Sequence, residues 1–183
     1  MKKIIIGSDH AGFAIKEALK PYLESLGYEV KDCGPEKYDP DDDYPDYISP
    51  VAHEVSKHAG HSGHVGGADA VNGAVKGIVV GASGQGEAMV ANRFPHVRAA
   101  VYYGYGLEQG NHSHKKEEMQ ALTAMRIIEL SRLHNDSNIL SLGAKFMDEN
   151  EAKAAVNLWL ETPFSGEARH KRRIGEIEKL STK

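Results

Sequence analysis

The feature that most constrains the fold is a short apolar run, a glycine-rich turn and a helix start, over residues 77–93. The apolar run at 78–80 is rich in β-branched residues, which is typical of a buried strand. Three glycines follow it: Gly81, Gly84 and Gly86. Glycines let backbone N–H groups approach an anionic or polyhydroxy ligand closely. A carboxylate, Glu87, stands where the helix begins and would repel a phosphate, so we expect it to act as a base.

This turn matches none of the common loop motifs. It lacks the Gly-Lys-Ser/Thr ending of a nucleoside-triphosphate loop. Gln85 stands where the Gly-x-Ser-x-Gly turn of hydrolases needs its second glycine. The glycine spacing also differs from the Gly-x-Gly-x-x-Gly pattern of dinucleotide-binding proteins. The alternative is a tight strand-to-helix turn without a ligand, but Ser83 and Glu87 exceed what such a turn requires.

Short apolar runs alternate along the chain with stretches whose apolar residues recur at helical spacing. Strands are predicted at 4–7, 28–32, 78–80, 98–102 and 139–142. Helices are predicted at 13–26, 47–57, 87–93, 117–133, 149–160 and 167–180. This alternation predicts an α/β fold in which helices cover both faces of a parallel sheet. Ligands of such folds bind beyond the carboxyl ends of the strands.

Length and composition predict one globular domain over residues 1–183, because 40% of the residues are hydrophobic and 26% are charged. Two segments without a clean period, 59–74 and 103–116, are expected to be loop insertions. The net charge of -4 gives no reason to expect nucleic acid or an anionic membrane as partner. No apolar run approaches the roughly 20 residues that span a bilayer.

The cysteine and histidine residues narrow the setting further. A single cysteine, Cys33, excludes an internal disulfide and fits a reducing compartment. The apolar run at the amino terminus is too short for a signal peptide, so we expect a cytoplasmic protein. No metal is expected, because no standard ligand set matches the spacing of the histidines in and beside the insertions. These are His58, His61, His64, His112 and His114.

Three further polar groups are candidates for function. Asp9 and His10 close the first strand, where they can take part in proton transfer, or Asp9 can simply cap the next helix. His134 ends the long helix and is either a general acid or a cation favoured at a helix C-terminus. Arg169 and Arg173 share one face of the last helix and can hold a phosphate. A solvated basic face is the alternative for these arginines.

Taken together, these blocks resemble the ribose-5-phosphate isomerase B family, which includes galactose-6-phosphate isomerase subunits. The likeness covers nearly the whole chain outside the insertions. It rests on Gly-Ser-Asp-His-Ala-Gly at 7–12, Asp-Tyr-Pro at 43–45, the glycine-rich turn at 81–87 with Ala-Asn-Arg at 91–93, His-Asn-Asp with Asn138 at 134–138, and Arg-His with Arg173 at 169–173.

The resemblance implies a Rossmann-like, flavodoxin-type three-layer sandwich with a central parallel sheet of about five strands. It implies a homodimer or a dimer of dimers whose active sites are shared between subunits. It also implies the reversible interconversion of an aldose phosphate and its ketose phosphate, without a metal or an organic cofactor.

The resemblance also assigns roles to individual residues. Glu87 takes the place of the base in one branch of the family, whereas another branch has a cysteine at the position of Gly81. His134 corresponds to the proton donor of sugar-ring opening. The positions of the substrate contacts are Asp9, His10, Ala82, Ser83, Gly84, Gln85, Gly86 and Asn135. The phosphate ligands correspond to Arg169 and Arg173, and Lys145 stands where the family usually has a further arginine.

The chemistry of isomerisation agrees with these residues. A proton moves between C2 and C1 through an enediolate, which requires one base and donors for the developing oxyanion. We expect Glu87 to be the base, and Ser83 with the N–H groups of the turn to be the donors. The predicted reaction interconverts ribose 5-phosphate and ribulose 5-phosphate. One alternative is the isomerisation of allose, galactose or tetrose phosphate, and another is a non-catalytic module that binds sugar phosphates.

Overall fold

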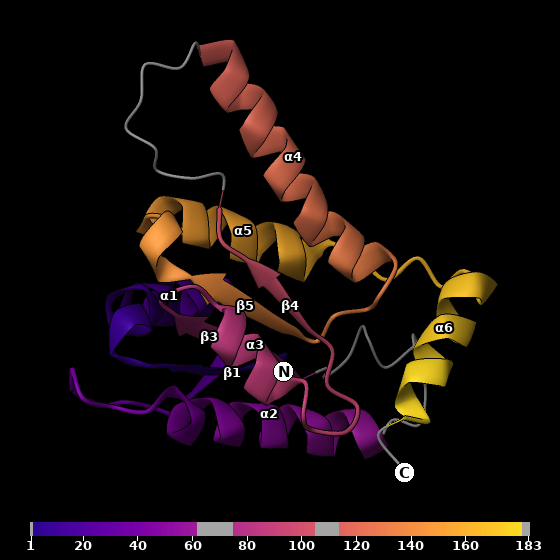
Figure 1. Cartoon of the computed structure of the whole chain (residues 1–183), viewed down its shortest axis with the longest axis horizontal. Helices are drawn as coiled ribbons and strands as arrows, with labels where there is room; N and C mark the ends of the chain where they lie inside the picture. The colour runs from indigo at the N-terminus through magenta and orange to yellow at the C-terminus, as the bar shows by residue number, and fades with distance from the viewer. Residues whose placement is uncertain (1, 62–74, 105–113, 181–183) are drawn as a thin grey trace.

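A five-stranded parallel sheet forms the middle of three layers in the computed structural model, which describes residues 2–61, 75–104 and 114–180 (Figure 1). The strands are β1 (Lys3–Ser8), β2 (Glu29–Asp32), β3 (Val75–Gly81), β4 (Ala99–Tyr102) and β5 (Ile139–Gly143). Their order across the sheet is β2-β1-β3-β5-β4. The predicted Rossmann-like α/β fold is confirmed. The order exchanges the last two strands relative to the flavodoxin order 2-1-3-4-5.

In the described part of the chain, six α-helices accompany the sheet at the places that the helical spacing predicts. They are α1 (Phe13–Ser25), α2 (Tyr44–His61), α3 (Gln85–Ala91), α4 (His114–Leu133), α5 (Glu149–Glu161) and α6 (Ala168–Glu178). The helices α1, α4 and α5 pack on one face of the sheet, and α2 and α3 pack on the other. Helix α6 lies at the periphery, at the right of Figure 1.

The side chains of β1 show how the sheet divides the core. Ile4 and Ile6 belong to the hydrophobic cluster beneath α1 and α5, which also contains the fully buried Trp159. Ile5 belongs to the cluster beneath α2 and α3. Successive side chains of a strand point to opposite faces, so a sheet covered on both sides requires a continuous apolar run.

The carboxyl ends of β1 and β3 are held tightly against each other. The amide of Asp9 donates a hydrogen bond to the carbonyl of Val80 (3.2 Å), and a β-carbon on Gly12 would come within 2.3 Å of the same oxygen. After β1 the chain continues to β2 on one side, and after β3 it continues to β4 at the far edge of the other side. Strands β1 and β3 therefore flank the switch point at which ligands of such sheets bind.

The two predicted insertions are described only at their ends. Residues 59–61 belong to α2, and residues 114–116 begin α4. The segments 62–74 and 105–113 lie outside the described residues. Within the described part of the chain, no helix is long and apolar enough to cross a membrane.

Candidate active site

Glu87 lies in the first turn of α3, and its side chain folds back onto the end of β3. The residue is only 4% exposed although it carries a carboxyl group. A β-carbon on Gly81 would come within 1.8 Å of its Oε1 atom, so the carboxyl group occupies the space of a side chain at position 81. Burial raises the pKa of Glu87, and the nearby charge of Asp9 raises it further against an opposing backbone hydrogen bond. A raised pKa in a site next to a glycine-rich turn is typical of a catalytic base.

Hydrogen bonds and close packing with the neighbouring strand β5 fix the glycine-rich turn in place. Gly84 adopts the left-handed conformation, with φ at 73°. Its carbonyl accepts hydrogen bonds from the hydroxyl of Ser141 (2.6 Å) and from the amide of Ala88 (3.1 Å). A β-carbon on Gly84 would also press on the backbone of Leu142 at 3.1 Å. The turn is therefore held in one shape before any ligand binds, which favours stabilisation of a developing charge.

Ser83 and Lys145 lie on this same edge of the sheet. The amide of Lys145, in the short 3-10 helix η3 (Ala144–Phe146), donates to the carbonyl of Ala82 (3.0 Å). The hydroxyl oxygen of Ser83 accepts from the amide of Gln85 (3.3 Å), which leaves the hydroxyl hydrogen free to donate. A cavity of about 430 Å³ lies beside them. Its lining residues are Ser83, Gln85, Tyr103, Gly104 and Phe146.

Asp9 is the cap that one interpretation of the sequence predicted. Its Oδ1 atom accepts a hydrogen bond from the amide of Gly12 (3.0 Å) at the start of the short 3-10 helix η1 (His10–Gly12). Asp9 is 6% exposed, and burial raises its pKa although the bond from Gly12 works in the other direction. The amide of Asp9 is bound to the carbonyl of Val80, and the carboxyl group of Glu87 lies against the next residue, Gly81. The structure therefore brings Asp9 and Glu87 to the same end of the sheet.

The segment from the end of β2 to the first residue of α2 supplies two residues, Asp42 and Tyr44, to which the sequence gave no role in the site. Asp42 binds His10 through its Oδ1 atom, which lies 2.6 Å from Nδ1 of the imidazole. Tyr44 covers the glycine-rich turn, because a β-carbon on Gly86 would come within 2.9 Å of its ring. The acidic run before α2 contains several carboxylates, and nothing in the sequence indicates which of them reaches a residue 32 positions away.

The remaining predicted site residues lie at the opposite edge of the sheet, the one formed by the amino ends of the strands. They are His134, Asn135, Arg169 and Arg173. Gly77 pairs with Ile139 at the amino ends of β3 and β5, whereas Gly81 pairs with Gly143 at their carboxyl ends. Four residue steps along a strand cover about 13 Å. His134 precedes the amino end of β5, and Glu87 lies at the carboxyl end of β3. One chain therefore does not bring Glu87 and His134 to the same small ligand.

At this second edge His134 is associated with α6. Its imidazole lies against that of His170, with ring centroids 4.4 Å apart. His170 is buried, its Nδ1 atom lies 2.9 Å from the hydroxyl of Ser165, and burial lowers its pKa with a smaller contribution from His134. Arg169 and Arg173 are exposed on the same helix, so α6 unites the histidine and the arginines.

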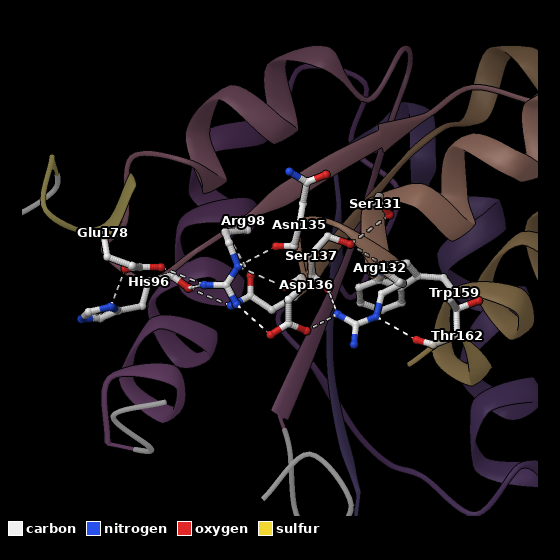
Figure 2. Close-up of polar contacts among 11 residues, drawn as sticks. His96, Arg98, Ser131, Arg132, Asn135, Asp136, Ser137, Trp159, Thr162 and Glu178 are labelled. Carbon is white, nitrogen blue, oxygen red and sulfur yellow. Dashed lines mark hydrogen bonds and ion pairs between the residues drawn. The ribbon is translucent and has the colours of Figure 1, made fainter. Parts of the chain in front are cut away.

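A polar network anchors the turn that carries His134 and Asn135 (Figure 2). Nε of Arg98 donates to the carbonyls of Asn135 and Asp136, each at 3.1 Å. Nη1 of Arg98 donates to Oε1 of Glu178 in α6 at 2.8 Å. The side-chain amide of Asn135 points away from this network in Figure 2, so it is available to a ligand. The sequence did not identify Arg98 or Glu178, which lie 80 positions apart.

Histidine clusters do not add a further site in the described part of the chain. No group of three or more histidine, cysteine, aspartate or glutamate side chains there has the arrangement of a metal site. His64 and His112 lie outside the described residues.

The fold defines a Rossmann-like α/β protein, with a buried carboxyl group beside a glycine-rich turn at the switch point of its sheet. A family model for Ribose/Galactose Isomerase matches residues 4–128 and 104–177. The chain therefore belongs to the ribose/galactose isomerase family, as the resemblance of its motifs predicted.

Individual relatives agree with this assignment. The chain is 33% identical to ribose-5-phosphate isomerase B of Escherichia coli over 97% of its own length and 95% of the relative's. It is 31% identical to ribose-5-phosphate isomerase B of Mycolicibacterium paratuberculosis, with coverage of 94% and 87%. The crystal structure of ribose-5-phosphate isomerase B from Mycoplasma genitalium with bound ribulose-5-phosphate superposes with a TM-score of 0.77 at 28% identity, and covers 99% of this chain and 97% of that chain.

Proposed function

We propose that this protein is a ribose-5-phosphate isomerase that interconverts ribose 5-phosphate and ribulose 5-phosphate. The observation that carries the proposal is the buried carboxyl group of Glu87, packed against Gly81 at the rim of a preformed glycine-rich turn. A buried carboxylate is costly to desolvate and repels a phosphate, so its place beside a turn of backbone donors favours proton transfer over phosphate binding. Membership of the ribose/galactose isomerase family supports the same reaction class.

In the proposed mechanism Glu87 transfers one proton between two carbons. Its carboxylate takes the proton from C2 of the open-chain aldose, and the electrons of the C–H bond form the enediolate. The negative charge that develops on oxygen is stabilised by the hydroxyl of Ser83 and the N–H groups of the turn. Glu87 then returns the proton to C1, while the hydroxyl proton of O2 passes to O1, and the carbonyl that forms at C2 completes the ketose. A base and oxyanion donors suffice for this transfer, so the proposal includes no metal and no organic cofactor.

The phosphate and the sugar ring are held, we propose, by a second copy of the chain. Glu87 and His134 are separated in one chain by about the length of β5. A homodimer, or a dimer of dimers, would place the His134 edge of one subunit over the Glu87 edge of its partner. His134 would then open the ring, and Arg169 and Arg173 would hold the phosphate through charge-assisted hydrogen bonds.

The second candidate is the isomerisation of a different sugar phosphate by the same residues. The feature that favours it is Lys145, whose backbone is bound to the glycine-rich turn at Ala82. Lysine keeps the positive charge of the arginine usual in the family, but lacks its two-pronged hydrogen bonding. The name of the Bacillus subtilis relative, which is 30% identical, specifies only a putative sugar phosphate isomerase.

A coupled assay of the purified protein tests both candidates. We expect kcat/KM to be highest for ribose 5-phosphate among the phosphates of ribose, allose, galactose and erythrose. Glu87→Gln should abolish turnover but retain most of the affinity for ribulose 5-phosphate, measured by calorimetry. Glu24→Gln, on the exposed side of α1, is the matched control and should keep wild-type rates. A preference for another sugar would reject ribose 5-phosphate as substrate, and near-normal rates in Glu87→Gln would reject the base.

A further inference from the structure

The imidazole of His10 is bound by a carboxylate from a distant loop. One oxygen of Asp42, Oδ1, lies 2.6 Å from Nδ1 of His10 and 3.1 Å from its backbone nitrogen. The two contacts fix both the backbone and the ring of His10 to the loop between β2 and α2. Tyr38 of the same loop meets the ring edge-on, with centroids 6.3 Å apart.

Burial makes this contact more demanding than an ordinary surface pair. The side chain of Asp42 is 2% exposed, whereas that of His10 is 35% exposed. The second oxygen of Asp42, Oδ2, is buried without a hydrogen-bond partner among the described residues. A buried carboxylate with an unpaired oxygen is costly, so a proton on Nδ1 of His10 compensates a charge that the protein would otherwise leave isolated.

The arrangement leaves one ring nitrogen of His10 for a ligand. Because Nδ1 is bound to Asp42, Nε2 is the atom available on the exposed part of the ring. His10 directly follows Asp9, whose amide is bound to the carbonyl of Val80, and Glu87 lies against the residue after Val80, Gly81. A group that donates from Nε2 therefore sits next to the proposed base, at the edge of the sheet where the substrate binds.

We propose that Asp42 is a positioning residue, which holds the His10 imidazole protonated on Nδ1 and directs its Nε2–H to an oxygen of the sugar phosphate. The inference rests on the proposed function and adds to it a residue, Asp42, that acts on the substrate through His10. Its effect is on binding, because the contact would be present in the ground state and the transition state alike.

The charges around His10 determine how this contact depends on pH. The hydrogen bond to Asp42 raises the pKa of His10 above its ordinary value of 6.5, burial opposes it, and the charges of Asp9, Asp42 and Asp39 add to the rise. His10 therefore keeps its positive charge to higher pH than a free histidine. Loss of Asp42 should leave the imidazole neutral near pH 7.5, but charged at pH 5.5 in both proteins.

Asp42→Asn is the sharpest variant, because the amide oxygen still accepts hydrogen bonds while the charge is lost. An NMR titration of the His10 ring should show a lower pKa in Asp42→Asn than in the wild type. Asp41→Asn is the matched control: it removes a charge from the same loop, and Asp41 is exposed and does not contact the imidazole. An unchanged His10 pKa in Asp42→Asn would overturn the proposal.

Kinetics of the full-length protein test the contact with substrate. At pH 7.5, Asp42→Asn should raise KM for ribose 5-phosphate about fivefold with little change in kcat, and the difference should close at pH 5.5. If Asp42→Asn and the wild type have the same KM at pH 7.5 and at pH 5.5, the proposed contact with substrate is wrong. If the variant raises KM by the same factor at both pH values, the role of Asp42 is only structural. If the wild type isomerises no sugar phosphate, the proposed function fails by itself, while the NMR titration still decides whether Asp42 governs His10.

Discussion

The carboxyl group of Glu87 and the α-carbon of Gly81 are in contact at the end of β3, where a β-carbon would lie 1.8 Å from Oε1. This contact explains why a glycine and a glutamate occur together here. A side chain at position 81 and a carboxylate from position 87 compete for the same volume. The resemblance to the isomerase family implies a base that is either a cysteine at the first position or a glutamate at the second, and the shared volume is a physical reason for such an alternation.

Gly81→Ala should therefore inactivate the enzyme without removing any functional group. The added methyl group forces the carboxylate of Glu87 away from its position, and a displacement of about 1 Å can lower kcat about 100-fold. The assay with ribose 5-phosphate measures this loss. Circular dichroism before the assay establishes that the variant is folded.

A double-mutant cycle separates this clash from a general effect of alanine at position 81. Gly81→Ala should lower the Tm of the wild type, because the methyl group and the buried carboxylate overlap. In a Glu87→Ala background the space is empty, so the same substitution should cost little stability. An equal loss of Tm in both backgrounds would show that the added methyl group does not clash with the carboxyl group of Glu87.

The pair of carboxyl groups at this edge predicts the acid limb of the pH profile. Burial raises the pKa of Glu87, and Asp9 raises it further. The base must be ionised, so kcat/KM should fall with decreasing pH at a midpoint above the ordinary glutamate value of 4.5. Asp9→Asn keeps the acceptor for Gly12 but removes the charge, so the midpoint should move to lower pH.

The pH at the midpoint of the acid limb tests this prediction, whereas the maximum value of kcat/KM does not. Asp9 is also a predicted substrate contact, and its replacement can lower the rate at every pH. The Asp41→Asn variant supplies the comparison, because Asp41 is exposed in the loop after β2. A midpoint that does not move in Asp9→Asn would show that Glu87 is not the group that titrates.

The elements of this fold follow from local patterns, and the site only partly does. Apolar runs such as Ile4–Ile6 and helical spacing such as that of Ile48, Val51 and Val55 report burial directly, so the predicted strands and helices recur in the structure. The glycine-rich turn also leaves a local signal, because the left-handed backbone at position 84 favours glycine. These signals are local in sequence.

Contacts between distant segments gave no comparable signal. Asp42 is one of three consecutive aspartates, and only the folded chain selects it as the partner of His10. Arg98 joins β4 to α6 through Glu178, although neither residue belongs to a motif. The separation of Glu87 from His134, by contrast, follows from the predicted parallel strands, because Glu87 comes after one strand and His134 comes before another.

This separation makes subunit complementation a direct test of how the active site is assembled. If Glu87 of one chain works with His134 of its partner, a heterodimer of Glu87→Gln and His134→Asn contains one doubly damaged site and one intact site. Co-expressed chains with different affinity tags allow the mixed dimer to be isolated. It should have about half the activity of the wild-type dimer, although each variant alone is inactive.

The choice of partners decides whether recovered activity reflects shared sites. A heterodimer of Glu87→Gln and Ser83→Ala damages the same edge in both chains, so both of its sites stay impaired and no activity should return. A heterodimer of Glu87→Gln with an Arg169→Ala, Arg173→Ala double variant should recover, because α6 lies with His134. If all three heterodimers are inactive, each chain completes its own site and the proposal of shared sites is wrong. We expect the opposite, because the span of β5 separates Glu87 from His134 by more than one small sugar phosphate can bridge.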